Sequence, residues 1–366
     1  MITWRRGTVV ALGREWAGAA ELDVDVAGTI VRALAYPRLT GRPRAGDEVL
    51  LNTGALDLGL GTGGYAWVVA VPARLPSPAA PGPAPGRAEP GHLVKARYTP
   101  LQAIVAGVDE QGSAHHDLLA DADDLGGMPV VVADLHSALP AVIAGYLANA
   151  APGSRIGYVM LDGGALPIWF SRTVASLREI GWLAGTVTAG QAFGGDLEAV
   201  SVHSGLLAAR HVLGADIAIV TQGPGNLGTG TRWGFSGVAA GEAVNAAAVL
   251  GGRPIASLRI SEADPRARHR GVSHHSLTAY GRVALARADV VVPDLPGEFG
   301  ASIAAAAAPL GGRHALVTVS VAGLREALAD CPVPLYTMGR GLDDDPAYFL
   351  AAAAAGRHAA ALAAQG

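Results

Sequence analysis

Ionisable side chains concentrate in one segment of the chain, residues 261–280, which reads SEADPRARHRGVSHHSLTAY. It holds two acids, three arginines and three histidines within fourteen positions: Glu262, Asp264, Arg266, Arg268, His269, Arg270, His274 and His275. Guanidinium groups form forked hydrogen bonds with phosphates and carboxylates, and imidazoles exchange protons near neutral pH. We therefore expect the arginines to bind an anion and one of the histidines, with His274 or His275 favoured, to transfer protons.

A glycine-rich loop, QGPGNLGTGT at residues 222–231, is the second candidate for ligand binding. Glycines let several backbone N–H groups turn toward one anion, and threonine hydroxyls add donors. The predicted ligand-binding residues here are Gly223, Gly225, Asn226, Gly228 and Thr229. A tight structural turn is the alternative explanation for so many glycines.

The same loop argues against two common nucleotide motifs. Three of its glycines fit G-x-G-x-x-G, but Gly230 and Gly234 prolong the loop before any helix begins. The next strand-end acid, Glu262, also lies too far along the chain for the dinucleotide motif. The loop has no lysine at the position that a P-loop requires, so a P-loop is excluded and a dinucleotide is not favoured.

Two aspartates, Asp134 and Asp162, directly follow predicted strands and are candidate partners for a catalytic histidine. A mixed set of histidine and carboxylate ligands suits zinc, manganese or iron, and the candidate ligands are His136, Asp134, Asp162 and His274. No H-E-x-x-H or H-x-H spacing supports a metal, and adjacent histidines on a strand would point to opposite faces. A divalent metal is thus one alternative, and ion pairing at a subunit interface is another.

Lys95 is the only lysine among 27 lysines and arginines. A lone lysine in an arginine-rich chain suggests a position where a guanidinium cannot replace the compact ammonium. We expect Lys95 to reach an acidic partner or the ligand pocket. An ordinary surface lysine is the alternative.

Seven short apolar segments alternate with helix-like segments from about residue 93 onward. The predicted strands are PVVVAD (129–134), RIGYVML (155–161), WLAGTV (182–187), DIAIVT (216–221), PIASLRI (254–260), DVVVP (289–293) and HALVTV (314–319). This alternation predicts an α/β fold, a mostly parallel sheet with helices on both faces. Carboxyl ends of parallel strands share one edge, where ligands bind, so the candidate residues are expected to line one pocket.

The chain divides into four predicted regions. Residues 1–72 contain five short β-rich runs separated by turns and predict a small N-terminal β-barrel or β-sandwich. Residues 73–92 are proline-rich and predict a linker or surface loop. Residues 93–320 form the predicted α/β domain with the site, and residues 321–366 a C-terminal helical extension.

Composition limits the classes of partner. The chain has 366 residues, half of them hydrophobic, and a net charge of −4, which favours neither nucleic acid nor an acidic membrane surface. No uninterrupted apolar run reaches the roughly 18 residues of a membrane span, and the N-terminal residues do not read as a signal peptide. We expect a cytoplasmic protein that binds a small anionic ligand, with a homodimer as one oligomeric state.

Five motifs resemble a known family. They are RYTPLQ (97–102), LDGGALP (161–167), TAGQAFGGDLEAV (188–200), GPGNLGTGT (223–231) and RHRGVSHHSLTAYGR (268–282). Together they are similar to the uncharacterised bacterial family catalogued as domain of unknown function 3866, over nearly the whole chain. The resemblance implies no activity, fold or cofactor. It does mark the predicted strand ends as shared family segments.

The sequence thus predicts an enzyme that acts on a phosphorylated or carboxylate metabolite by His/Asp acid–base chemistry at the carboxyl edge of a parallel sheet. A hydrolase, a lyase and a transferase all fit this description. A non-catalytic ligand-binding or regulatory protein on the same scaffold is the main alternative, and a structural oligomer is a third.

Overall fold

The computed structural model describes residues 2–75 and 91–365, which form two compact units. The first unit contains the N-terminal part of the chain with Ala96–Ala103 and Trp169–Ala175. The second contains Gly91–Lys95, Ile104–Ile168 and the chain from Ser176 onward. Most of the predicted proline-rich linker, residues 76–90, lies outside the described residues.

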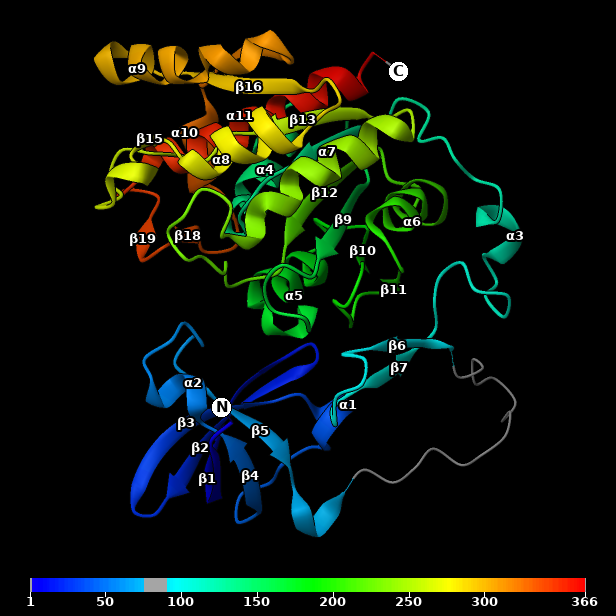
Figure 1. Ribbon diagram of the computed structural model, residues 1–366, viewed down its shortest axis with the longest axis vertical. Coiled ribbons are helices and arrows are strands. Elements are labelled where there is room, and N and C mark those ends of the chain that lie inside the picture. The colour runs from blue at the N-terminus through cyan, green and yellow to red at the C-terminus, as the bar shows by residue number, and fades with distance from the viewer. Residues whose placement is uncertain (1, 76–90, 366) are drawn as a thin grey trace. The chain divides into compact units, whose positions relative to one another are not determined.

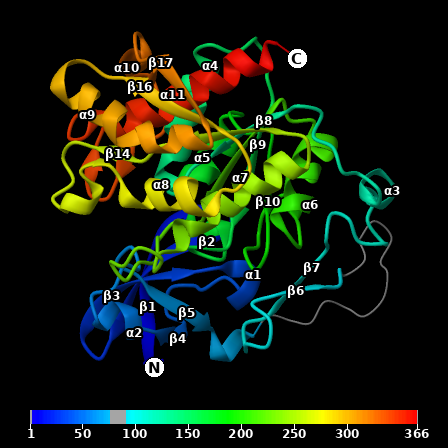
Figure 2. The same cartoon turned by 45° about the horizontal axis from the view of Figure 1, so that its top comes forward.

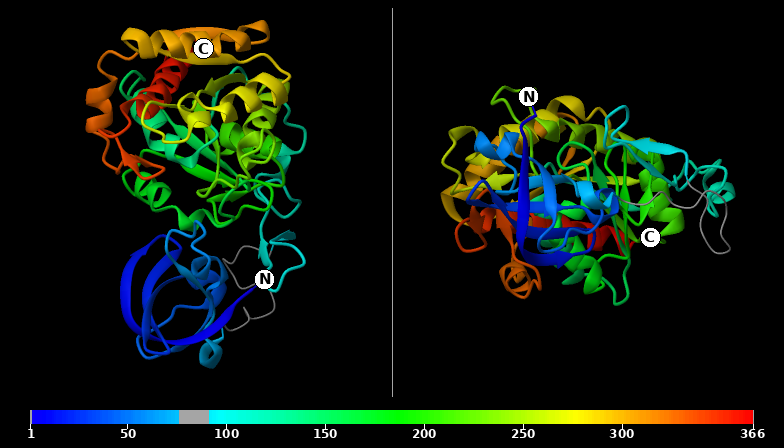
Figure 3. Two further views of the ribbon diagram at one scale, coloured as in Figure 1. Left: turned by 60° about the vertical axis from the view of Figure 1, so that its left-hand side comes forward. Right: turned by 90° about the horizontal axis from the view of Figure 1, so that it is seen from below.

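The first unit is a closed five-stranded barrel, as the β-rich runs predict. Its strands are β1 (Trp4–Trp16), β2 (Ala19–Val26), β3 (Thr29–Ala35), β4 (Glu48–Asn52) and β5 (Ala66–Ala70), joined in the order β1-β2-β3-β5-β4. Alternate residues such as Leu22, Val24 and Val49 point inward and are fully buried, which is the period of two that a half-buried strand requires. Two one-turn helices, α1 (Pro37–Thr40) and α2 (Gly54–Asp57), lie in the connections. Figure 3 shows the blue strands curving around the barrel.

The second unit is built on an eight-stranded, entirely parallel sheet (Figure 1). Its order is β11-β10-β9-β12-β8-β13-β16-β17. The strands are β8 (Pro129–Val132), β9 (Ile156–Leu161), β10 (Gly185–Thr188), β11 (Leu197–Glu198), β12 (Ile217–Gln222), β13 (Arg253–Ser257), β16 (Asp289–Asp294) and β17 (Ala315–Ser320). The predicted α/β class and parallel sheet are therefore confirmed.

The remaining helices and short hairpins belong to this unit, apart from residues 103 and 172–175, which belong to the first unit. The helices are α3 (His116–Leu119), α4 (Leu139–Leu147), α5 (Arg172–Glu179), α6 (Val202–Leu207), α7 (Ala239–Val249), α8 (His274–Thr278), α9 (Gly297–Ala307), α10 (Leu324–Ala329) and α11 (Pro346–Ala363). Three two-stranded sheets pair β6 (Leu93–Lys95) with β7 (Ala103–Val105), β14 (Ile260–Ser261) with β15 (Gly271–Val272), and β18 (Tyr336–Thr337) with β19 (Arg340–Gly341). In the described parts of the chain, no helix is both long and apolar enough to cross a membrane.

The alanine-rich helix α11 packs beside α4 and against strands β8, β13 and β16 (Figure 2). Ala351–Ala355 are buried, since the small alanine side chains let helix and sheet approach closely. The C-terminal segment therefore belongs to the core of the α/β unit. It also carries Asp345 into the candidate site described below.

Neighbouring strands β8 and β12 send the chain to opposite faces of the sheet. β8 leads through α4 to β9, and β12 leads through α7 to β13, in the opposite direction across the sheet. Connections of this kind are nearly always right-handed, which places α4 and α7 on opposite faces, as they lie in Figure 1. The carboxyl ends of β8 and β12 thus flank a topological switch point, where open α/β sheets bind ligands.

Candidate functional site

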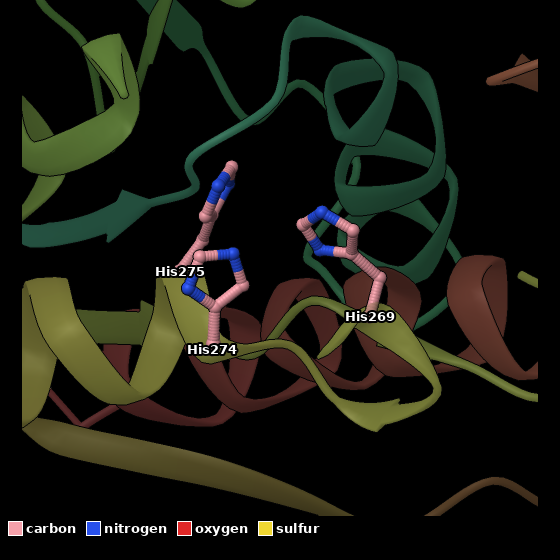
Figure 4. A group of neighbouring side chains, drawn as sticks. All are labelled: His269, His274 and His275. Carbon is pink, nitrogen blue, oxygen red and sulfur yellow. The ribbon is translucent and has the colours of Figure 1, made fainter. Parts of the chain in front are cut away.

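Three histidines gather beside this switch point. His274 and His275 form the first turn of α8, and His269 ends the preceding 3₁₀ turn, Ala267–His269. One ring nitrogen from each histidine lies within 4.8 Å of the other two, and Figure 4 shows the three imidazoles around a common space. The expectation that His274 and His275 would point apart assumed a strand and is wrong, because they begin a helix, where successive side chains are about 100° apart.

Asp134 belongs to the same group. It follows β8 and is only 3% exposed, and its Oδ2 lies 3.5 Å from His275 Nδ1 and 3.9 Å from an Nη of Arg259. Within the described residues, Asp134 Oδ2, His274 Nε2 and Gln222 Oε1 are buried and make no hydrogen bond. Buried polar atoms without partners cost about 1–3 kcal/mol each, so three of them at one sheet edge indicate a site that a ligand completes.

Neighbouring side chains fix two of the imidazoles. His269 Nδ1 lies 2.8 Å from Ser273 Oγ, and Ser273 caps α8 by accepting the backbone N–H of His275 at 3.2 Å. The ring of His275 stacks on Phe235, with centroids 3.7 Å apart and an interplanar angle of 5°. These contacts hold both rings in defined orientations before any ligand binds.

Burial keeps two of the histidines neutral. Burial, with the positive charges of Arg259 and Arg266, lowers the pKa of His269 to about 3. Burial, with the charges of His275 and Arg268, also lowers the pKa of His274. Neutral imidazoles keep a lone pair on one nitrogen, which makes them good metal ligands and weak proton acceptors near pH 7.

Beneath the histidines lies a buried ionic network. Asp264 has no exposed surface and accepts hydrogen bonds from Arg266 Nε at 2.9 Å and Nη2 at 2.8 Å. Arg340 bridges Asp264 at 3.3 Å and the buried Asp345 at 3.0 Å, and Arg259 lies 3.7 Å from Asp264. Burial alone would raise the pKa of Asp264, but the Arg266 hydrogen bonds and the nearby guanidinium charges hold it well below its usual range. Arg266 is therefore engaged in the protein's own scaffold.

Arg268 and Arg270 differ from Arg266. Both are exposed, and no hydrogen bond or ion pair with residues 2–75 or 91–365 holds either guanidinium. Arg268 Nη2 approaches the glycine loop, 3.9 Å from where a Cβ on Gly230 would lie. Arg268 has spare donors beside His269, His274 and His275, which we call the histidine cluster, and is therefore the arginine best placed to bind an anion.

The glycine loop connects β12 to α7 and partly satisfies itself. The N–H groups of Leu227 and Thr229 donate to Ser236 Oγ at 3.0 Å and to the Gly234 carbonyl at 2.7 Å. Asn226 Oδ1 accepts a hydrogen bond from Ser236 at 2.8 Å. The backbone N–H of Thr229, one of the residues predicted to bind an anion, is therefore already used within the loop.

The glycines of this loop differ in what they require. Gly225 has a φ of +88°, where a side chain would be strained. Gly223 packs against the backbone of Ala165, which leaves no room for a Cβ. Gly228 and Thr229 are exposed at the loop tip.

Two other predicted residues lie outside the cluster. Asp162 follows β9, which β12 separates from β8, and its Oδ2 accepts the Gln191 N–H at 2.8 Å. The Nδ1 of His136 lies 2.9 Å from the Tyr158 hydroxyl, which in turn meets Thr221. Burial lowers the pKa of His136 to about 4. In the described residues, the group able to hold a metal contains His269, His274 and His275 rather than His136 or Asp162.

Lys95 is the last residue of β6 and is 2% exposed, and its ammonium lies beside the ends of β10 and β11. Its ammonium donates to the carbonyls of Gly190 at 2.7 Å, Ala192 at 3.0 Å and Ala199 at 3.0 Å. Glu198 Oε2, 3.6 Å away, is the acidic partner that the sequence led us to expect. Burial lowers the pKa of Lys95, against the opposing charge of Glu198. Its predicted contact with a ligand stays a prediction.

Sequence reasoning missed several residues of the site. These are Gln222, Phe235, Arg259, Ser273, Arg340 and Asp345. Gln222 could have been found from its place at the end of a strand, directly before the glycine loop. Arg340 and Asp345 could have been found from the charged run GRGLDDD in an otherwise apolar C-terminal region. Phe235 and Ser273 carry no local signal, because their role depends on which rings they touch.

A cavity of about 530 Å³ lies at the opposite, amino edge of the sheet. Tyr146, Arg210, Asp216 and Arg253 contribute to its lining. Arg253 already contacts the carbonyl of Leu362, at 3.4 Å, and so closes the end of α11. This cavity is the competing location for a ligand, and experiments on the histidine cluster need a control there.

Comparison with known proteins gives one match. The family model described as "Protein of unknown function (DUF3866)" matches residues 32–356, which include every residue of the cluster. No curated protein and no solved structure matches the chain.

Proposed function

The chain belongs to the DUF3866 family, whose description gives no function, so we propose from the site alone that it is an enzyme acting on a small anionic metabolite. The reacting groups are the histidine cluster, defined as His269, His274 and His275, and the neighbouring Asp134. The substrate's phosphate or carboxylate binds Arg268 and the glycine loop.

One observation carries this proposal: within the described residues, Asp134 Oδ2 and His274 Nε2 are buried and have no hydrogen-bond partner where the histidine cluster meets the switch point. A scaffold alone would leave such atoms paired, as it does in the Asp264 network. Instead Asp134 Oδ2 and His274 Nε2 keep unused hydrogen-bonding capacity. Unpaired buried groups at a preorganised site cost stability and are typical of residues retained for chemistry.

Replacing His274 with Ala, or Asp134 with Asn, is expected to abolish turnover of the metabolite while leaving the fold intact. Among residues 2–75 and 91–365, His274 Nε2 and Asp134 Oδ2 make no hydrogen bonds that the substitutions would break. The metabolite is found by screening phosphorylated and carboxylate compounds for thermal stabilisation, followed by mass spectrometry of products. We expect a loss of at least about 100-fold in kcat/KM, as for removal of a side chain that acts directly on the reacting atoms.

The matched control is His203→Ala, which removes an exposed histidine from α6 in the same unit. Turnover should survive this change and also Arg253→Ala at the amino-edge cavity. Turnover that persists in His274→Ala and Asp134→Asn, or is lost only in Arg253→Ala, would overturn the proposed site. A compound that binds tightly but is never converted would instead favour a ligand-binding protein.

Arg268→Ala is expected to weaken binding of inorganic phosphate by about 10- to 100-fold, since a charge-assisted hydrogen bond contributes about 1.5–3 kcal/mol. Thermal stability should hardly change, because Arg268 is exposed and unpaired among the described residues. Isothermal titration with phosphate measures the effect. Arg287→Ala, an equal charge change near the amino end of β16, is the control. Equal losses in both variants would mean that only the general field of the protein attracts phosphate.

A further inference from the structure

We propose that the histidine cluster binds a divalent transition-metal ion through His269, His274 and His275, with Asp134 orienting His275. This inference deepens the proposed function and rests on the same site. Three protein ligands leave a coordination position for water or substrate, as in catalytic zinc sites.

Geometry is the first argument. One nitrogen of each imidazole lies within 4.8 Å of the others, and the rings face one space (Figure 4). Zinc–nitrogen bonds of about 2.0–2.1 Å place tetrahedral ligands about 3.3 Å apart. Rotation that moves ring nitrogens by about an ångström closes the cluster around an ion, and His274 is the side chain to move, because its Nε2 makes no hydrogen bond with the described residues.

The outer contacts of the imidazoles are the second argument. Metal-binding histidines usually donate their other ring N–H to a carboxylate or another oxygen, which fixes the tautomer. His269 Nδ1 has Ser273 Oγ at 2.8 Å, and His275 Nδ1 has Asp134 Oδ2 at 3.5 Å. Both Nε2 lone pairs are then free for a metal.

Arg259 creates a choice of tautomer for His275. Its Nη1 lies 3.4 Å from His275 Nδ1 and can donate to it only when that nitrogen carries no proton. In that tautomer Asp134 Oδ2 has no N–H to accept, which is the condition in which it is unpaired. A cation on Nε2 selects the other tautomer, in which Nδ1–H points toward Asp134 and satisfies it.

His274 supplies the independent observation. Its Nε2 is buried and makes no hydrogen bond with any described residue. A buried imidazole nitrogen beside two others is costly unless a ligand uses it. Nitrogen-only ligands favour zinc, cobalt, nickel, copper or iron over magnesium and calcium, which prefer oxygen.

Charge balance connects the ion to an anionic substrate. Three buried carboxylates, Asp134, Asp264 and Asp345, face the guanidiniums of Arg259, Arg266 and Arg340, so by formal charge this group is neutral. A divalent ion therefore gives the site an excess positive charge, to which Arg268 adds. An anion completes the site electrostatically.

Titration of metal-free full-length protein with Co²⁺ tests the site, because tetrahedral cobalt has an intense visible spectrum. We expect one Co²⁺ per chain, displaced by Zn²⁺. His269→Gln and His274→Gln, which keep side-chain volume and polarity, should weaken binding by more than 100-fold, and Asp134→Asn by about 10- to 100-fold. His203→Ala should bind as the wild type does, and circular dichroism verifies the fold of each variant.

Absence of stoichiometric Co²⁺ or Zn²⁺ binding, or equal binding by the folded Gln variants, would overturn the metal site. Failure of the metal site and failure of the proposed function give different results. Turnover by metal-free protein would support the enzyme proposal and exclude the metal from the reaction. Tight metal binding without conversion of any compound would support the metal site and count against the enzyme proposal.

Discussion

Asp264→Asn is expected to lower the free energy of unfolding of the α/β unit by about 3–5 kcal/mol. Asp264 is completely buried and accepts two hydrogen bonds from the Arg266 guanidinium, one from the Arg266 backbone N–H and one from Arg340. Asparagine presents an N–H₂ group to one of these donors and removes one negative charge from a buried network that contains Arg259 and Arg340. Urea denaturation followed by circular dichroism measures the loss.

Asp134→Asn is the matched control, because both aspartates are buried and lie close to Arg259, at 3.7 Å for Asp264 and 3.9 Å for Asp134. Asp134 Oδ2 makes no hydrogen bond within the described residues, and Arg259 keeps Asp264 as a counter-charge, so this change should lower stability by no more than about 1 kcal/mol. A much smaller loss in Asp134→Asn than in Asp264→Asn distinguishes site from scaffold. Equal destabilisation by both would show that Asp134 also belongs to the scaffold.

The effect of Asp264 should depend on pH in one direction. Because its pKa is lowered on folding, its contribution is complete above the ordinary aspartate pKa of about 3.9 and declines as the pH falls toward the lowered value. The difference between the wild type and Asp264→Asn should therefore be constant near neutral pH and shrink in acid. A difference that grows in acid would contradict the ion-pair explanation.

Lys95→Met is expected to cost about 3–5 kcal/mol, because it leaves Glu198 as a buried charge and removes a donor from three carbonyls. Lys95→Arg should also destabilise, by about 1–3 kcal/mol, since a planar guanidinium is too large for the space and cannot direct donors to three converging oxygens. Thermal and urea denaturation measure both effects.

The double variant Lys95→Met with Glu198→Gln is the control for charge. It removes the orphaned carboxylate, so it should recover part of the stability lost in Lys95→Met. A Lys95→Arg variant as stable as the wild type would mean that position 95 needs only a positive charge. No recovery in the double variant would assign the loss to the carbonyls alone.

By itself, the local sequence pattern determined the barrel strands and seven of the eight strands of the parallel sheet, but not β11 or the helix that begins at His274. Alternating apolar residues mark the barrel strands, and continuous apolar runs such as 129–134 and 216–221 mark the buried strands of a parallel sheet. These patterns are readable because strand and helix periods arise from hydrogen bonds and packing within a few residues. Because parallel strands share a carboxyl edge, the same patterns also predicted where polar residues would collect.

Tertiary structure decided which of those residues meet. The strand order puts β12 between β9 and β8, so that Asp162 lies apart from Asp134, although both follow strands and look alike in sequence. Likewise, Arg266 and Arg268 are two positions apart, yet one is held by Asp264 and the other is unpaired among the described residues. Strand order and ion-pair choice depend on contacts between distant segments, such as Asp345 at the start of α11, and no local pattern records them.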